Sequence, residues 1–152
     1  MGIQVGQPAP DFTLKDQDQR DVRLTDFRGQ NVVLLFYPLD WSPVCTNEHA
    51  CFVNELKRFE QLNARILGIS VDSVWSHKAW AEKLGLGYPL LADFHPKGAV
   101  ARQYGFYLED KGIAARAIVV VDRQGRVAWA KQYEILQVPD VGEVAAVLEK
   151  LQ

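Results

Sequence analysis

Two apolar runs of the chain, at 31–37 and 65–71, are each bounded by polar residues or by proline. Runs of this length and composition are typical of strands buried on both faces of a sheet. The segment 43–62 between them carries apolar side chains at the spacing of one helix face, which predicts an amphipathic helix. Strand, helix and strand in this order indicate a right-handed parallel βαβ unit.

Shorter patterns flank this unit. Residues 10–24 contain two alternating runs around a polar turn, which predicts a hairpin. Helices are predicted at 76–84 and 97–104, each followed by glycine, and a second hairpin at 117–130. A last amphipathic helix begins near 139. This order predicts an α/β, thioredoxin-like fold, in which helices flank a central mixed β-sheet and a β-hairpin is added at the N-terminus.

Composition and charge narrow the functional classes. The 152 residues suffice for one domain, 1–152, with 48% apolar and 24% charged residues. A net charge of −2 without a basic run gives no electrostatic support for binding nucleic acid or an acidic membrane. No apolar run could span a bilayer, and the N-terminus lacks a signal pattern. We therefore expect a cytoplasmic protein, with no nucleic-acid or membrane partner.

One of the two cysteines, Cys45, falls in the first turn of the predicted helix 43–62. Ser42 suits the N-cap and Pro43 the first helical position, so Cys45 is the third helical residue. The unpaired N–H groups and the positive dipole end of a helix N-terminus both favour a thiolate. Because a thiol reacts as its thiolate, this position favours a reactive sulfur over one that only packs.

The motif around Cys45 resembles that of the peroxiredoxins. The family spacing is proline, three residues, threonine or serine, two residues and cysteine, which is met here by Pro38, Ser42 and Cys45. Glu48 follows three residues later, and Arg116 begins a late strand, as the family's arginine does. Further family-like phrases occur in order along nearly the whole chain, at 8–12, 70–73, 77–80, 88–93 and 103–105.

The resemblance implies reduction of a peroxide O–O bond, with Cys45 as the nucleophile that becomes a sulfenic acid. Arg116 would hold the thiolate and a peroxide oxygen, while the Ser42 hydroxyl would donate to the peroxide or orient it. Pro38 would shield the sulfur from water, and Glu48 would buttress Arg116. This chemistry needs no cofactor and no metal.

The second cysteine, Cys51, leaves two alternatives open. In Q-type peroxiredoxins a resolving cysteine lies five residues after the first, whereas here the spacing is six. On an intact helix the two Cα atoms would be ~10 Å apart, beyond the disulfide limit of about 7 Å, so a Cys45–Cys51 bond would require the helix to unwind. Otherwise Cys51 packs in the core and an external thiol reduces the sulfenic acid, as in the AhpE type. The chain therefore resembles a member that lies between these two subfamilies.

The family resemblance also implies the partners. Hydrogen peroxide and organic hydroperoxides are the expected substrates, and thioredoxin or a similar thiol is the expected reductant. A homodimer through the loops around the active site is a further expectation. Two other classes stay open: a thiol–disulfide oxidoreductase, disfavoured because Cys-x-x-Cys is absent, and a non-enzymatic redox sensor or holdase.

Overall fold

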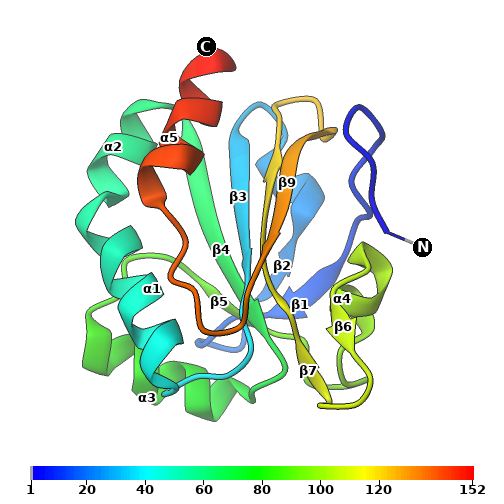
Figure 1. Ribbon diagram of the computed structural model, residues 1–152, viewed down its shortest axis with the longest axis vertical. Coiled ribbons are helices and arrows are strands. Elements are labelled where there is room, and N and C mark those ends of the chain that lie inside the picture. Colours follow the sequence, from blue (N-terminus) through cyan, green and yellow to red (C-terminus); the bar gives the residue numbers. More distant parts are fainter. Residues whose placement is uncertain (1) are drawn as a thin grey trace.

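A seven-stranded mixed sheet forms the centre of the computed structural model, which describes residues 2–152 (Figure 1). Its strands are β1 (Thr13–Lys15), β2 (Asp21–Arg23), β3 (Asn31–Phe36), β4 (Ala64–Ser70), β5 (Leu90–Ala92), β8 (Arg116–Val121) and β9 (Val127–Tyr133). Their order across the sheet is β2-β1-β5-β4-β3-β8-β9. A separate two-stranded hairpin pairs β6 (Tyr107–Leu108) with β7 (Ile113–Ala114).

Helices cover both faces of this sheet (Figure 1). They are α1 (Pro43–Asn54), α2 (Leu56–Gln61), α3 (Val74–Leu84), α4 (Ala99–Tyr104) and α5 (Val141–Lys150), with a short 3-10 helix at Leu24–Phe27. Among the described residues, none of these helices is long and apolar enough to cross a membrane.

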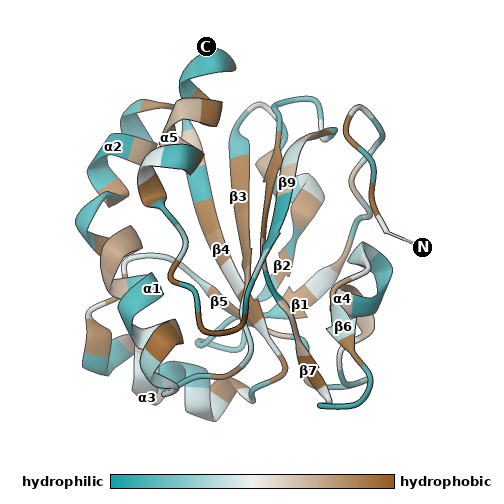
Figure 2. Cartoon of the chain, in the orientation of Figure 1, coloured by the Kyte–Doolittle hydropathy of each residue, from teal (hydrophilic) through white to brown (hydrophobic). Residues whose placement is uncertain are grey.

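The central strand β3 is buried along its whole length, as its apolar run predicts. Side chains alternate between the two faces of a strand, so Val33 and Leu35 join a core beneath α1, α2, α3 and α5. Leu34 and Phe36 join a second core on the opposite face, where α4 packs. Figure 2 shows the apolar residues gathered along β3, in the middle of the sheet.

The predicted βαβ unit is confirmed, because β3 and β4 pair in parallel with α1 and α2 between them. On its other side β3 pairs antiparallel with β8, in a register that places Phe36 opposite Ala117. The first residue of β8, Arg116, therefore lies near the end of β3 from which the chain continues into α1. This register brings Arg116 close to Cys45, which lies 71 positions earlier in the sequence.

The predicted hairpins are also confirmed, as β1–β2 and β8–β9. The single helix predicted at 43–62 is wrong: it divides at Glu55, whose N–H bonds to the carbonyl of Phe52 only three residues back. α3 begins at Val74 rather than at 76, because Ser73 caps it by accepting the N–H of Ser76. The strands β5, β6 and β7 were not predicted, since two or three residues are too few for an alternating pattern to be visible.

Candidate active site

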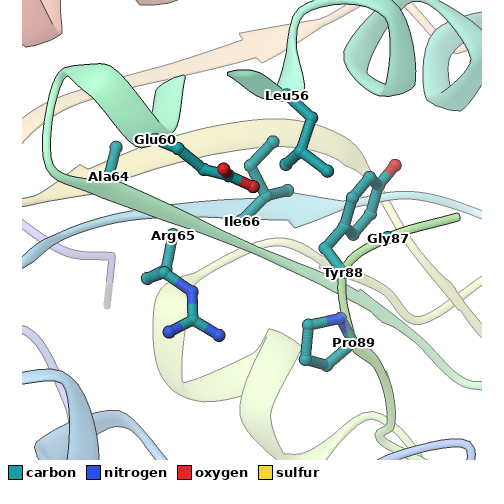
Figure 3. Close-up of a pocket in the computed structure, with 8 residues that line it drawn as sticks. All are labelled: Leu56, Glu60, Ala64, Arg65, Ile66, Gly87, Tyr88 and Pro89. Carbon is teal, nitrogen blue, oxygen red and sulfur yellow. The ribbon is translucent and has the colours of Figure 1, made fainter. Parts of the chain in front are cut away.

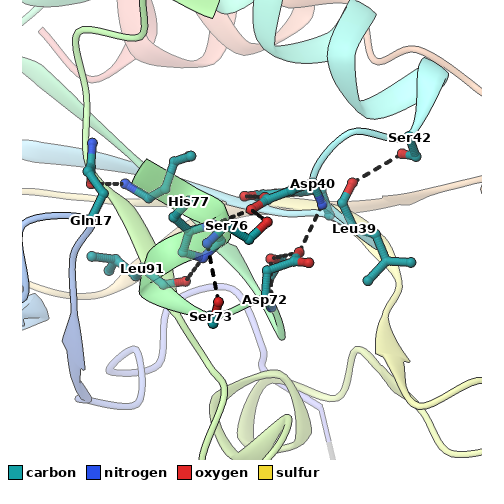
Figure 4. Close-up of polar contacts among 12 residues, drawn as sticks. Gln17, Leu39, Asp40, Ser42, Asp72, Ser73, Ser76, His77 and Leu91 are labelled. Carbon is teal, nitrogen blue, oxygen red and sulfur yellow. Dashed lines mark hydrogen bonds and ion pairs between the residues drawn. The ribbon is translucent and has the colours of Figure 1, made fainter. Parts of the chain in front are cut away.

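The chain passes from β3 through a short loop into α1, and Cys45 lies in the first turn of this helix. Ser42 is the N-cap, Pro43 the first helical residue and Cys45 the third, as predicted. The Ser42 hydroxyl, however, does not accept a first-turn N–H: it donates to the carbonyl of Leu39 at 3.1 Å (Figure 4). The predicted capping position is therefore confirmed, whereas its side-chain cap is replaced by a bond within the loop.

Arg116 places its guanidinium directly against the sulfur of Cys45. Both terminal nitrogens, Nη1 and Nη2, lie 3.3 Å from Sγ, and Nε donates to the carbonyl of Ile135 at 3.0 Å. The Cys45 side chain is completely buried, and Arg116 is almost completely so. A planar cation with two donors on one sulfur stabilises the thiolate and orients it.

Glu48, one helical turn after Cys45, completes this cluster. Its Oε1 accepts a hydrogen bond from Arg116 Nη1 at 2.5 Å, while Oε2 has no hydrogen-bond partner among residues 2–152. Burial raises the pKa of Glu48 to about 7, although the charge and the hydrogen bond of Arg116 act in the opposite direction. The structure thus brings together three of the side chains that the sequence singled out.

The remaining predicted residues are placed differently. Pro38 is buried in the loop between β3 and α1, and its role as a shield of the sulfur stays a prediction. Cys51 is a free, half-buried thiol on α1, which is continuous from Pro43 to Asn54 and so separates it from Cys45. It lines a groove of about 390 Å³ between α1 and the start of α5.

Sequence reasoning assigned no role to a buried histidine beside the site, His49. Its Nδ1 shares a hydrogen bond with the hydroxyl of Tyr88 at 2.5 Å, and its ring makes edge contacts with Tyr37 and Trp80. Burial lowers the pKa of His49 to about 3, so the imidazole is neutral at neutral pH. His49 therefore packs as an aromatic group on the buried side of α1 and adds no charge near the thiol.

A cavity of about 280 Å³ lies beside α2 and β4, away from this cluster (Figure 3). Its lining residues are Leu56, Glu60, Ala64, Arg65, Ile66, Gly87, Tyr88 and Pro89. None of the predicted site residues lines it. Nor does any group of three His, Cys, Asp or Glu side chains within residues 2–152 come together as a metal site requires.

The chain combines a thioredoxin-like sheet with a buried cysteine at a helix start and an arginine against the cysteine sulfur. These features define a class of proteins that react through a cysteine thiol. The model of the AhpC/TSA family matches residues 5–130. Alkyl hydroperoxide reductase E of Mycobacterium tuberculosis is 42% identical over 139 residues, which cover 91% of each chain. The chain therefore belongs to the AhpC/TSA family and is a peroxiredoxin.

Solved structures agree with this assignment. The crystal structure of Enterococcus faecalis AhpC superposes with a TM-score of 0.90 at 30% identity and covers 99% of this chain and 92% of that one. Peroxidoxin BcpB from Mycobacterium tuberculosis gives 0.88 at 29% identity, with 99% of both chains covered. Peroxiredoxins are thiol-dependent peroxidases. The two alternatives, a thiol–disulfide oxidoreductase and a non-enzymatic redox sensor or holdase, are therefore not favoured.

Proposed function

We propose that Cys45 is the nucleophile of peroxide reduction, and that residues 1–152 carry this activity as one domain. The Cys45 thiolate attacks one peroxide oxygen, forming an S–O bond with the electron pair of the sulfur as the O–O bond breaks. The sulfur is oxidised to a sulfenic acid, and the second oxygen leaves as hydroxide or alkoxide, which takes up a proton to become water or alcohol. Hydrogen peroxide and organic hydroperoxides are the proposed substrates.

The neighbouring side chains would act on the charge that moves during this step. Negative charge passes from the sulfur toward the leaving oxygen, so donors fixed beside the sulfur stabilise the transition state. Arg116 is held by Glu48 and by the carbonyl of Ile135, so it needs little reorganisation as the charge moves. We assign Ser42 to orienting the peroxide, which requires its hydroxyl to exchange the Leu39 carbonyl for a peroxide oxygen.

Access to the sulfur needs a local movement. The Cys45 side chain has no exposed surface, so the peroxide reaches it only when neighbouring groups shift. We assign Pro38, buried in the loop that precedes α1, to excluding bulk water from the sulfur. Exclusion of water strengthens the electrostatic interactions of Arg116 within the site.

The observation that carries this proposal is the pair of Arg116 donors at 3.3 Å from Cys45 Sγ. The experiment compares Cys45→Ser with the matched variant Cys51→Ser, following peroxide consumption with dithiothreitol as the reductant. We expect Cys45→Ser to abolish peroxide consumption and Cys51→Ser to retain it. Full turnover by Cys45→Ser would overturn the proposal.

We further propose that an external thiol, thioredoxin or a similar protein, reduces the sulfenic acid. Both cysteines lie on the uninterrupted α1, six residues apart, which corresponds to ~10 Å between their Cα atoms. Reduced protein should be treated with one equivalent of hydrogen peroxide, with and without dimedone, and its intact mass measured. A dimedone adduct on Cys45 is expected, whereas loss of two hydrogens without an adduct would show that Cys51 resolves it and that α1 unwinds.

We also propose a cytoplasmic homodimer that associates through the loops around the active site. Two free thiols fit a reducing compartment. Large apolar side chains are exposed just beyond the ends of β3, β4 and β5: Leu39 and Trp41 in the loop after β3, Trp75 in the first turn of α3, and Phe94 after β5. These strands are parallel, so the four side chains lie at the same edge of the sheet as Cys45.

The dimer can be tested on one of these exposed side chains. Trp75→Arg is expected to lower the mass measured by light scattering from that of a dimer to that of a monomer. Val5→Arg, a change of an equally exposed residue near the N-terminus, should leave the mass unchanged. A wild-type protein that is monomeric at all concentrations would refute this part of the proposal.

A further inference from the structure

The loop between β3 and α1 is held by one buried carboxylate, that of Asp40 (Figure 4). Three side chains contact its two oxygens. The Tyr37 hydroxyl donates to Oδ1 at 2.6 Å, the Ser76 hydroxyl donates to Oδ2 at 2.9 Å, and Nδ1 of His77 lies 2.7 Å from Oδ2. Two of these partners belong to α3, which lies 36 or 37 positions further along the chain.

The partners of Asp40 are themselves anchored to the sheet. His77 Nε2 lies 3.1 Å from the carbonyl of Leu91 in β5. The Asp40 backbone N–H donates to Asp72 at 2.8 Å, and Asp72 also accepts from the hydroxyl of Ser70, the last residue of β4, at 2.6 Å. The loop is therefore tied through Asp40 to α3 and to the ends of β4 and β5.

The protons of this network follow from its donors and acceptors. The carbonyl of Leu91 can only accept, so Nε2 of His77 carries a hydrogen. Nδ1 of His77 faces Oδ2 of Asp40 at 2.7 Å, which is a hydrogen-bond distance. Both oxygens of the buried Asp40 carboxyl are therefore hydrogen-bonded. Fully satisfied buried networks of this kind hold one geometry.

The backbone next to Asp40 is strained. Trp41 has φ +74°, in the left-handed region that costs a non-glycine residue roughly 1–2 kcal/mol. Such a conformation persists only where the surrounding structure enforces it. Trp41 lies between Asp40 and Ser42, the N-cap of α1. The carboxyl of Asp40 is held by three side chains. The Asp40 anchor therefore sets the direction in which the chain enters α1.

We propose that Asp40 and His77 are positioning residues of the peroxide reaction. Through the loop 38–42 they hold the first turn of α1, and with it the sulfur of Cys45 relative to Arg116. This inference rests on the proposed role of Cys45. It assigns a function to a buried pair of side chains that the reaction itself does not use.

The experiment compares two reactions of the same thiol, in a Cys51→Ser background so that only Cys45 reacts. Peroxide reduction needs the thiolate and a fixed geometry, whereas alkylation by iodoacetamide needs only an accessible thiolate. The rate constants for hydrogen peroxide and for iodoacetamide are measured on reduced protein by stopped flow and by mass spectrometry. Their ratio reports positioning, and the matched tyrosine variants described below separate a positioning effect from a general loss of stability.

Asp40→Ala is expected to lower the peroxide-to-iodoacetamide ratio by about 100-fold, because a displacement of ~1 Å at a reacting atom has an effect of this size. His77→Ala should lower it by a similar factor, and the double variant should lower it no further, since the two residues act as one unit. Asp40→Asn should restore the ratio to within about fivefold of the parent. Its amide can accept from Tyr37 and donate to Nδ1 of His77, so only one hydrogen bond is lost.

Two tyrosines provide a matched control. Tyr37→Phe removes the donor to Asp40, and Tyr104→Phe removes a buried hydroxyl that donates at the same 2.6 Å to Pro10. We expect Tyr37→Phe to lower the ratio about fivefold and Tyr104→Phe to leave it unchanged. The tyrosine pair also keeps the test decisive if Asp40→Ala does not fold.

An unchanged ratio in Asp40→Ala and Tyr37→Phe, with rapid peroxide reaction in the parent, would overturn the inference and leave the proposed function intact. Equal losses in Tyr37→Phe and Tyr104→Phe would also overturn it, because the effect would then belong to any buried hydroxyl. If the parent itself does not react with peroxide at Cys45, the proposed function fails first.

Discussion

Replacing Glu48 by glutamine tests whether the carboxyl beside Arg116 is protonated in the folded protein below neutral pH. Burial raises the pKa of Glu48 from its ordinary value of 4.5 to about 7. In the unfolded chain the same carboxyl is exposed and loses its proton near pH 4.5. Between these two values the folded state holds one proton more than the unfolded state, so the free energy of unfolding falls as the pH rises.

The size of this effect follows from the pKa difference. Each pKa unit corresponds to 1.36 kcal/mol, so Glu48 contributes about 3 kcal/mol of stability that is fully present below pH 4.5 and is lost as the pH rises through 7. Glutamine cannot titrate and should remove this dependence. His49 acts in the opposite direction, since its lowered pKa destabilises the folded state as the pH falls from about 6.5 toward 3.

The assay is urea unfolding, followed by tryptophan fluorescence between pH 4.5 and 8. Subtraction of the Glu48→Gln curve from the wild-type curve isolates Glu48, because His49 is common to both proteins. The difference should fall by about 3 kcal/mol across this range. Glu149→Gln is the matched control, because Glu149 also pairs with an arginine, Arg58 at 2.8 Å, but is about half exposed.

A wild-type minus Glu48→Gln difference that stays flat from pH 4.5 to 8 would refute the reasoning. It would mean that the Arg116 charge outweighs burial and keeps Glu48 ionised throughout. A difference of the same size for Glu149→Gln would show that the dependence does not come from burial.

Substitutions at three further positions have defined outcomes. Arg116→Met should lower the peroxide rate constant by about 100-fold and should also slow alkylation of Cys45 by iodoacetamide. Arg116→Lys keeps the charge, so it should lower mainly the peroxide rate constant. Both rate constants can be measured by stopped flow and mass spectrometry, and equal alkylation rates in the two variants would contradict a role for the Arg116 charge. Phe59→Ala removes a fully buried ring that packs on Phe52 at 5.7 Å, and should lower the free energy of unfolding in urea by about 3–5 kcal/mol. Gly125→Ala forces alanine to adopt φ +83° in the turn between β8 and β9, and its methyl group must also displace the guanidinium of Arg28. A loss below about 1 kcal/mol in the same assay would count against backbone strain.

Local signals predicted the start of α1 well. Ser42, Pro43 and Cys45 take the predicted helical positions, because capping preferences act within a few residues. The bond that the Ser42 hydroxyl makes was not predicted, since a serine at the N-cap has several backbone partners within reach. The carbonyl of Leu39 is one that only the folded loop presents. The division of the helix at Glu55 likewise has no proline or glycine to mark it.

The network around Asp40 shows what the pattern of residues leaves undetermined. Asp40 and His77 both lie in segments that resemble the family, yet nothing in their spacing indicates that they touch. Their contact depends on the parallel pairing of β3 with β4, which carries α3 to the end of the sheet where Asp40 lies. A solvated aspartate and a surface histidine were equally consistent with the sequence.

The sequence by itself determined the class of fold, the buried central strands and the cysteine at a helix start, because apolar periodicity and capping are local properties of the chain. The tertiary structure decided which distant groups meet that cysteine. The antiparallel register of β3 and β8 brings Arg116 to within 3.3 Å of the Cys45 sulfur across 71 positions. Burial then raises the pKa of Glu48, because the cost of removing a carboxylate from water arises only when the surrounding elements close over it.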